Sequence, residues 1–256
     1  MYQIKRVRIL TFNVHGCVGL DFRQSEERIA RRIAELAPDL VALQELDLGR
    51  ARSAGRDQAS LIARHLSFES HFHPAMRWKD ERYGNAILSR WPIRLRRAAA
   101  LPSEHAVLFR ESRAALWLEI STPAGPLQVI NTHLGVGRRE RREQTQALVG
   151  PDWLGAIPTD TPTLLTGDFN SLPGSEPIAL LGRSLVDLVK KNRGRHLRTF
   201  PAFWPLLTLD HVFGNARIDV TNIDVPSDWP HALVSDHLPL IVDFEIVDPA
   251  VSARAT

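Results

Sequence analysis

Six short segments of the sequence end an apolar stretch with an acidic residue, a carboxamide or a histidine. They are 9–15 (ILTFNVH), 40–45 (LVALQE), 129–134 (VINTHL), 164–170 (LLTGDFN), 209–213 (LDHVF) and 235–239 (SDHLP). Short apolar runs of this kind predict buried strands, and functional side chains are usually placed in the loops that follow rigid strands. We therefore expect the polar groups at these strand ends to converge on one cleft.

The converging side chains form a set of hard oxygen donors with few imidazoles. They are the carboxylates Glu45, Asp168, Asp210 and Asp236, the carboxamides Asn13 and Asn170, and the imidazoles His133 and His237. Crowded anionic oxygens repel one another unless a cation lies among them, and oxygen ligands without thiolates favour Mg²⁺ or Mn²⁺ over zinc. Such an ion polarises a phosphoryl oxygen, and a histidine beside an aspartate can contact the phosphate or transfer a proton. The set predicts metal-assisted phosphoester hydrolysis.

Each segment on its own also has an ordinary structural interpretation. Asn13 can cap a turn, the GDFN segment can form an Asx turn, and His133 can be a structural histidine with satisfied hydrogen bonds. Short motifs often match by chance. The functional interpretation is favoured because all six segments occur in one chain and all stand at predicted strand ends.

The elements that must position these groups are short strands interspersed with amphipathic helices. Ser25 can cap a helix whose apolar stripe is Ile29, Ile33 and Leu36, and Pro38 ends it. Further helices are expected at 57–66 and 138–149. Strands are expected at 7–13, 40–44, 86–88, 114–120, 127–131, 163–166, 211–213, 218–225 and 240–246. This mixture predicts an α/β protein with two mixed β-sheets packed together and helices outside them.

Length and composition restrict the class of protein. The chain has 256 residues, of which 44% are hydrophobic and 24% charged, and these values exclude a disordered or fibrous protein. A net charge of +3 permits an anionic partner without requiring one. Cys17 is the single cysteine, which excludes an internal disulfide and a zinc site built on several thiolates.

Domain organisation and location follow from the absence of linkers and long apolar runs. We expect one domain over residues 5–247 and a flexible C-terminal tail at 248–256. No apolar run is long enough for a transmembrane segment, so a cytoplasmic protein is expected. We expect a monomer without a stable protein partner.

The six segments, in this order, resemble the endonuclease/exonuclease/phosphatase superfamily over nearly the whole chain, from about Val7 to Phe244. The GDFN and SDHLP segments are the most specific part of the resemblance. It implies a four-layered α/β sandwich with two central mixed sheets, an active site at one edge, and dependence on Mg²⁺ or Mn²⁺.

The resemblance also implies roles for individual metal-site residues. Glu45 matches the principal metal ligand and Asn13 a second metal-binding position. Asp168 matches the aspartate that positions or deprotonates the attacking water, and Asn170 the amide that orients the phosphate. Asp236 precedes the catalytic histidine and, like Asp168 and Asn170, is expected at the metal.

The histidines receive roles at the scissile phosphate. His237 matches the catalytic histidine and Asp210 the carboxylate that pairs with it. His133 matches a position directed at the phosphate, with Asn131 as a helper. The deoxyribonuclease-like branch has a glutamate that supports the first histidine, and the segment 82–90 (RYGNAILSR) has no counterpart to it.

Basic and aromatic segments near the predicted strand ends leave the substrate open. Arg113 and Arg138 are candidates for phosphate contact, but interleaved glutamates make the segment after Arg138 equally compatible with a solvated helix face. The loop that contains Phe200, Phe203 and Trp204 can stack on bases, enter a lipid interface or pack over the core, and packing is expected.

The sequence therefore predicts a divalent-metal-dependent phosphodiester hydrolase. Its expected substrate is a nucleic acid or a phospholipid head group. The alternatives are a phosphomonoesterase of the same fold and a catalytically silent module that binds nucleic acid or membranes.

Overall fold

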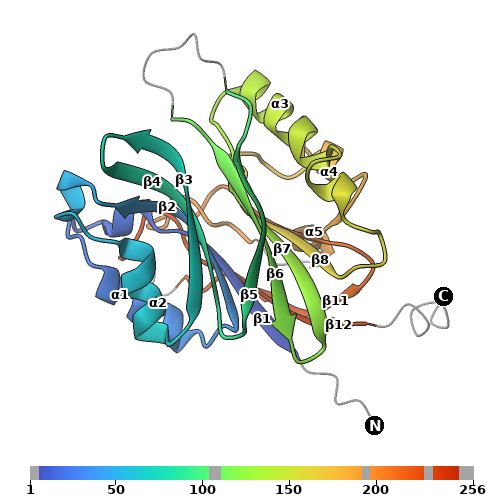
Figure 1. Ribbon diagram of the computed structural model, residues 1–256, viewed down its shortest axis with the longest axis horizontal. Helices are drawn as coiled ribbons and strands as arrows, with labels where there is room; N and C mark the ends of the chain where they lie inside the picture. The colour runs from blue at the N-terminus through green and yellow to red at the C-terminus, as the bar shows by residue number, and fades with distance from the viewer. Residues whose placement is uncertain (1–5, 104–110, 192–196, 228–232, 248–256) are drawn as a thin grey trace.

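Two six-stranded mixed sheets pack face to face, with helices on their outer faces (Figure 1). The computed structural model describes residues 6–103, 111–191, 197–227 and 233–247. The expected tail at 248–256 lies outside the described residues. The predicted α/β sandwich of two packed mixed sheets is confirmed.

The first sheet has the strand order β11-β12-β1-β2-β4-β3. Its strands are β1 (Val7–Asn13), β2 (Leu40–Leu48), β3 (Glu69–Trp78), β4 (Glu81–Ser89), β11 (Ile218–Asp224) and β12 (Leu240–Ile246). β1 and β2 are parallel, and the other pairs are antiparallel. The sequence places β12 last, but the sheet places it between β11 and β1.

The second sheet has the strand order β5-β6-β7-β8-β10-β9. Its strands are β5 (Ile93–Ala100), β6 (Ala114–Thr122), β7 (Gly125–His133), β8 (Thr163–Asp168), β9 (Val186–Asp187) and β10 (Asp210–Gly214). β7 and β8 are its parallel pair. The ends of β7 and β8 therefore lie at the same edge of the sheet.

The central strands are apolar on both faces because both faces are covered. In β1, Ile9 packs into the cluster between the two sheets, whereas Leu10 and Phe12 pack toward the helices on the outer face. All three side chains are at most 1% exposed. A strand buried on both sides is rich in apolar residues without strict alternation, and β1 has this pattern.

The helices cover the outer faces of the two sheets (Figure 1). They are α1 (Glu26–Glu35), α2 (Gln58–Leu66), α3 (Arg138–Val149), α4 (Glu176–Leu181) and α5 (Leu188–Lys191), with 3-10 turns η1 (His15–Cys17), η2 (Ala51–Ser53) and η3 (Leu154–Ala156). The predicted cap of α1 is confirmed, because the Ser25 hydroxyl accepts a hydrogen bond from the Arg28 N–H (3.2 Å). Ile29 and Ile33 of its stripe are buried under the first sheet.

The sequence patterns missed strands β3, β5 and β9 and helices α4 and α5. β3 and β5 are edge strands that are partly exposed along their length, so they lack an apolar run, and Pro74 interrupts β3. β9 and α5 have two and four residues, which is too short for a periodicity to show. The three missed strands all lie at edges of the sheets.

Candidate active site

Three predicted site residues lie side by side on adjacent strands of the second sheet. In the strand register His133 of β7 is the partner of Asp168 of β8, and Asp168 is the partner of Asp210 of β10. The first sheet ends at the same place, where Asn13 closes β1. The Ser235 hydroxyl donates to the Asn13 carbonyl (2.7 Å) and so brings the segment that carries His237 to this edge.

A glycine allows β8 to reach this position beside β7. Gly167 has φ +139°, and a Cβ atom there would lie 1.8 Å from the Thr132 carbonyl oxygen. No side chain can be accommodated at that distance, so glycine is required directly before Asp168. This steric limit explains why the GDFN segment begins with glycine.

A β-bulge in β2 sets the direction of Glu45. Between the pairs Leu43–Ala86 and Leu46–Gly84, β2 has two residues where β4 has one. Glu45 has φ +63°, a left-handed conformation that costs energy for a residue with a side chain. Strained backbone that persists in a well-packed sheet is typical of functional positions.

The amide of Asn13 connects the carboxylates of the two sheets. Its Nδ2 donates to Glu45 Oε1 (2.9 Å) and to Asp168 Oδ2 (3.1 Å). Asn13 Oδ1 accepts from the His15 N–H (3.1 Å), which fixes the orientation of the amide. Glu45, Asn13 and Asp168 therefore form one continuous group across the interface between the sheets.

His15 is a residue of this site that the sequence analysis did not select. Its Nδ1 lies 3.5 Å from Glu45 Oε2 and 3.6 Å from Asp236 Oδ2, and its side chain is half exposed. Burial favours a raised pKa for the Glu45 carboxyl, but hydrogen bonds from His15 and Asn13 hold this pKa well below its usual range. The hydrogen bond to Glu45 in turn raises the pKa of His15. The available signal was the histidine within the segment ILTFNVH.

His237 and Asp210 form a buried ion pair. His237 Nδ1 lies 2.9 Å from Asp210 Oδ2, and His237 Nε2 lies 3.6 Å from Asp168 Oδ2. Burial acts to lower the pKa of His237, but the charge and the hydrogen bond of Asp210 outweigh it and raise the pKa to about 10. Burial and the charge of Asp210 together raise the pKa of Asp168 to about 6. At neutral pH the imidazole is a cation that faces two carboxylates.

His133 is a neutral imidazole. Burial and the adjacent Arg113 guanidinium lower its pKa to about 3. Arg113 Nη1 lies 3.3 Å from His133 Nδ1, and a guanidinium can only donate, so Nδ1 accepts and the proton is on Nε2. His133 Nε2 lies 3.5 Å from Asp168 Oδ2. The imidazole N–H therefore points into the cluster.

Asn170 completes the group from the loop after β8. Its backbone N–H donates to Asp168 Oδ1 (2.8 Å), and its Nδ2 donates to the Leu134 carbonyl (2.8 Å). Nδ2 is also 3.1 Å from His133 Nε2, and because an amide nitrogen only donates, the proton on Nε2 makes this a contact without a hydrogen bond. Asn170 has φ +46°, the third left-handed residue of the site after His15 and Glu45.

Three candidate residues take other positions. Asn131 is fully buried between the sheets, where its Nδ2 donates to the Leu43 and Ala86 carbonyls and its Oδ1 accepts from Gln44. It joins the sheets and is left without a group to offer a phosphate. Arg113 is 7% exposed and contacts His133, so it lies behind the imidazole.

The third candidate, Arg138, lies in the first turn of α3, where it is 86% exposed and 3.8 Å from the Glu176 carboxylate on α4. That ion pair directs it toward the neighbouring helix. Asp236 reaches the site through His15, and its side chain is 34% exposed.

The arrangement offers ligands that fit a divalent cation. Ligand atoms of Asp168, Asp210 and His237 lie within 4.8 Å of one another, and because His237 is protonated the carboxylate oxygens are the donors of this group. The buried Oδ1 of Asp210 has no hydrogen-bond partner among the described residues, and a buried oxygen in that state is stabilised by a cation. Asp168 belongs both to this trio and to the set centred on Glu45.

Two packed mixed sheets that bring carboxylates, amides and imidazoles together at one edge define an α/β-sandwich hydrolase. The model of the Endonuclease/Exonuclease/phosphatase family matches residues 10–237, and the chain belongs to this family. Members of the family are hydrolases and typically depend on divalent metals. In the described part of the chain no helix is long and apolar enough to span a membrane.

Similar proteins come from bacteria and from humans. The chain is 27% identical over 258 residues to the Escherichia coli (strain K12) protein YbhP, covering 93% of this chain and 96% of that one. An endonuclease/exonuclease/phosphatase from Bacteroides vulgatus has a TM-score of 0.74 and 20% identity, covering 95% of this chain and all of that chain.

The catalytic domain of human Nocturnin with bound sulfate has a TM-score of 0.69 and 21% identity, covering 94% of each chain. The mannosyl-6-phosphatase Bt3783 of Bacteroides thetaiotaomicron has a TM-score of 0.73 and 18% identity, covering 93% of this chain and 99% of that chain. At these identities the similarity to solved structures shows the fold alone.

Proposed function

We propose that the protein is a phosphodiester hydrolase that depends on Mg²⁺ or Mn²⁺. The observation that supports this most strongly is the Asn13 amide, which joins Glu45 to Asp168 at 2.9 and 3.1 Å while the His237–Asp210 pair faces Asp168. The carboxylate oxygens, the positive charge of His237 and the neutral N–H of His133 therefore lie together around Asp168.

Glu45 is the principal ligand in this proposal, with Asp168 beside it, and the Asn13 amide N–H groups hold the two carboxylates together. Asn170 and Asp236 complete the proposed set. A bound divalent cation supplies neutralisation of charge on the phosphate and on the leaving oxygen. Oxygen ligands with one or two imidazoles favour Mg²⁺ or Mn²⁺ for this role.

Side chains of the protein carry out the other parts of the proposed reaction. Asp168 orients a water molecule and accepts its proton as the water oxygen bonds to phosphorus and the bond to the leaving oxygen breaks. His237, held as a cation by Asp210 through Nδ1, donates its Nε2–H to a phosphate oxygen as negative charge develops there. His133 offers its Nε2–H to the same group, and Asn170 orients the phosphate.

A phosphomonoester is the second candidate substrate. One structural neighbour is named a mannosyl-6-phosphatase, and the same cluster can accept a terminal phosphate. The human Nocturnin domain is described with a bound sulfate anion, which has the tetrahedral shape of a phosphate. Both observations concern neighbours that share the fold, and the choice between ester classes is therefore a matter for direct assay.

The test compares hydrolysis of bis-p-nitrophenyl phosphate with that of p-nitrophenyl phosphate, each with Mg²⁺, with Mn²⁺ and with EDTA. We expect metal-dependent cleavage of the diester and a loss of about 10²- to 10⁴-fold in kcat for Asp168→Asn, because the water loses its proton acceptor. Asp219→Asn changes an exposed carboxylate of β11 and is the matched control. Full activity in EDTA, or in Asp168→Asn, would contradict the assignment.

A further inference from the structure

Large hydrophobic side chains are exposed around the edge of the molecule that carries the site. In the described part of the chain ten such side chains are exposed, and eight of them form what we call the apolar rim: Phe22, Trp78, Val136, Leu172, Phe203, Trp204, Leu206 and Leu207. The other two, Leu95 and Val186, lie on β5 and β9. Exposed apolar groups gathered on one side of a protein indicate an interaction surface.

The rim segments continue from the strands that carry the site. Val136 follows the end of β7, Leu172 follows the end of β8, and Phe22 lies in the loop between β1 and α1. Trp78 is the last residue of β3, at the end where β4 begins beside the end of β2. Residues 203–207 lie in the loop that leads into β10.

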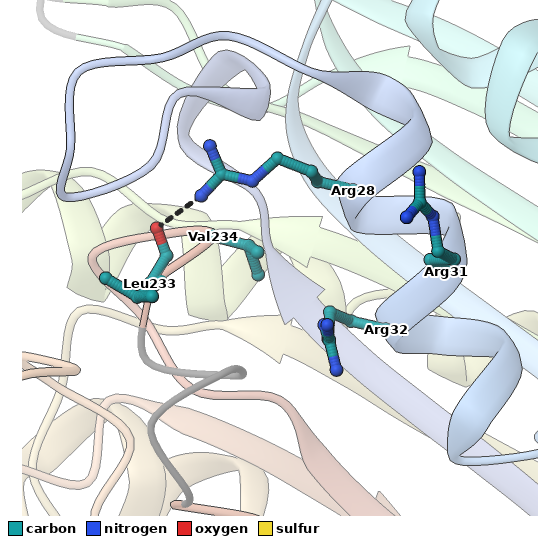
Figure 2. Close-up of a pocket in the computed structure, with 5 residues that line it drawn as sticks. All are labelled: Arg28, Arg31, Arg32, Leu233 and Val234. Carbon is teal, nitrogen blue, oxygen red and sulfur yellow. Dashed lines mark hydrogen bonds between the residues drawn. The ribbon is translucent and has the colours of Figure 1, made fainter.

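The turn that presents Phe22 is braced. The Leu20 N–H donates to the Leu233 carbonyl (3.0 Å), and Arg28 donates to the same carbonyl (3.2 Å; Figure 2). Arg28 also pairs with Asp21 (2.9 Å). Phe22 has φ +59° and is 91% exposed. A bulky residue is thus held in an unfavourable conformation at full exposure, which favours a role outside the core.

A hollow of about 240 Å³ lies beside this turn (Figure 2). Its basic residues are Arg28, Arg31 and Arg32. Each of these three guanidinium groups has a carboxylate partner nearby, on Asp21, Glu27 and Glu35 respectively. We therefore assign this hollow no anion, and Arg28 acts as a brace for the turn.

A second braced loop presents Phe203 and Trp204. The Phe200 N–H donates to the Leu207 carbonyl (3.1 Å), and the Leu207 N–H donates to the Phe200 carbonyl (2.8 Å). The Trp204 N–H donates to the Pro201 carbonyl (3.0 Å). Phe203 and Trp204 are 65% and 66% exposed at the tip of this closed loop, so the expectation that the loop packs over the core is wrong for these two rings.

Both turns are attached to the active site. The Ala202 N–H donates to the Asp236 carbonyl (2.7 Å), and the Phe200 ring lies 4.8 Å from the His237 ring between centroids. Ala202 and Leu20 pack into the same small hydrophobic cluster. The aromatic tips therefore have a defined position relative to the catalytic imidazole.

The chemistry of the rim fits a lipid surface better than nucleobases. Its aliphatic members are Val136, Leu172, Leu206 and Leu207. Aliphatic side chains cannot stack on bases, which is how single-stranded nucleic acids are held. Exposed cations stand next to rim residues: Arg23 follows Phe22, and Arg77 and Lys79 flank Trp78. Of the two exposed acids nearby, Asp21 is paired with Arg28, and Asp80 follows Lys79. Apolar tips with adjacent cations complement an anionic bilayer.

We propose that the apolar rim docks the protein on an anionic membrane surface. The rim side chains enter the head-group layer, and the active site faces the depth at which lipid phosphodiesters lie. This inference rests on the proposed function and narrows its substrate to the head-group phosphodiesters of lipids. Because the aromatic turns are braced before docking, their insertion costs little conformational entropy.

The test measures co-sedimentation with vesicles of phosphatidylcholine and phosphatidylglycerol in equal parts, in EDTA so that binding is separated from hydrolysis. We expect the wild type to bind these vesicles more tightly than vesicles of phosphatidylcholine alone. The double variant Phe22→Ser/Trp204→Ser should bind at least tenfold more weakly. The matched control, Leu95→Ser/Val186→Ser, removes as many exposed apolar groups away from the rim and should bind like the wild type.

Several outcomes overturn the inference. The first is that the wild type does not bind vesicles, and the second is that the rim variant binds them as tightly as the wild type. The third is that the rim variant keeps its vesicle binding but loses affinity for single-stranded DNA or loses self-association. Thermal unfolding checks that the variants fold. The rim variant should cleave bis-p-nitrophenyl phosphate at the wild-type rate; if the wild type does not cleave it at all, the proposed function fails whether or not vesicles bind.

Discussion

Burial disfavours the charged form of both histidines that face Asp168, and their neighbours decide whether burial is outweighed. His237 contacts the Asp210 carboxylate and is held as a cation, whereas His133 contacts the Arg113 guanidinium and is held neutral. Titratable groups whose environments separate their pKa values are typical of active sites. One imidazole then supplies a fixed charge, and the other supplies a neutral N–H.

Arg113→Gln tests this explanation. Removing the cation beside His133 stabilises the protonated imidazole, so we expect the pKa of His133 to rise from about 3. The measurement is an NMR titration of the histidine ring protons in metal-free protein, with the ring of His65 at the end of α2 as an internal reference. An unchanged His133 resonance over the titrated range would show that burial alone sets its charge.

Residue types at strand ends were sufficient to select most of the cluster. Asn13, Glu45, Asp168, Asn170 and the histidine pair meet as expected because strand ends on neighbouring strands share an edge. His15 and the partners of Asn131 were not predictable in this way. Their positions depend on a left-handed turn after β1 and on contacts across the two sheets, and neither leaves a periodic signal.

At the scale of the elements, small departures from regular strands position the groups of the candidate site. The bulge in β2 gives Glu45 its direction, and Gly167 allows β8 to lie against β7 directly before Asp168. A regular strand would alternate its side chains and send neighbouring residues to opposite faces. The site therefore depends on two local irregularities within otherwise regular sheets.

Gly167→Ala should destabilise the protein by at least about 3 kcal/mol, because the added Cβ would overlap the Thr132 carbonyl. Gly55→Ala is the matched control, since Gly55 also has a positive φ (+71°) but a Cβ there meets nothing within 4 Å. Its cost should be limited to about 1–2 kcal/mol of backbone strain. Urea unfolding of both variants measures the difference, and similar values for the two would refute the steric argument.

Strands that are buried on both faces were predicted more accurately than strands that are partly exposed. β1 and β12 were predicted with the observed bounds, since both are buried along most of their length and are rich in branched apolar residues. Edge strands β3 and β5 were missed because they are partly exposed along their length and mix polar with apolar residues. The position of a strand within its sheet decides how clearly the sequence pattern indicates it, and that position cannot be read from the pattern itself.

At the scale of the whole molecule, the first and last strands hold the fold together. β12 pairs with β1 in the register Val7–Phe244, and Asp243 on β12 accepts hydrogen bonds from Arg8 Nε (2.7 Å) and Nη2 (3.0 Å). The Asp243 carboxylate is buried, and it also contacts Arg6. The charge of this carboxylate thus links the two ends of the described chain.

This link predicts a dependence of stability on pH. Burial acts to raise the pKa of Asp243, but hydrogen bonds from Arg8 and Asn222 lower it below its ordinary value. Because the pKa is depressed in the folded state, the stabilisation is present above the unfolded pKa near 4 and is lost as the pH falls through the folded value. Asp243→Asn should cost about 1–2 kcal/mol at pH 7.

The measurement is thermal unfolding of the wild type and Asp243→Asn from pH 7 to pH 3. The difference in Tm should narrow below about pH 4. Asp219→Asn changes an exposed carboxylate on β11 and should show a small difference throughout. If the difference in Tm between the wild type and Asp243→Asn stays constant with pH, Asp243 contributes packing and not charge.

The place of β12 in the first sheet has a consequence for synthesis. Asn13 is synthesised before His237 and before β12, the strand that pairs with β1. A partly made chain therefore lacks both the imidazole cation and the central strand that joins β11 to β1. In the proposed function, chains that end before His237 lack the cation that contacts the phosphate, so we expect such truncated or degraded chains to be inactive toward phosphodiesters.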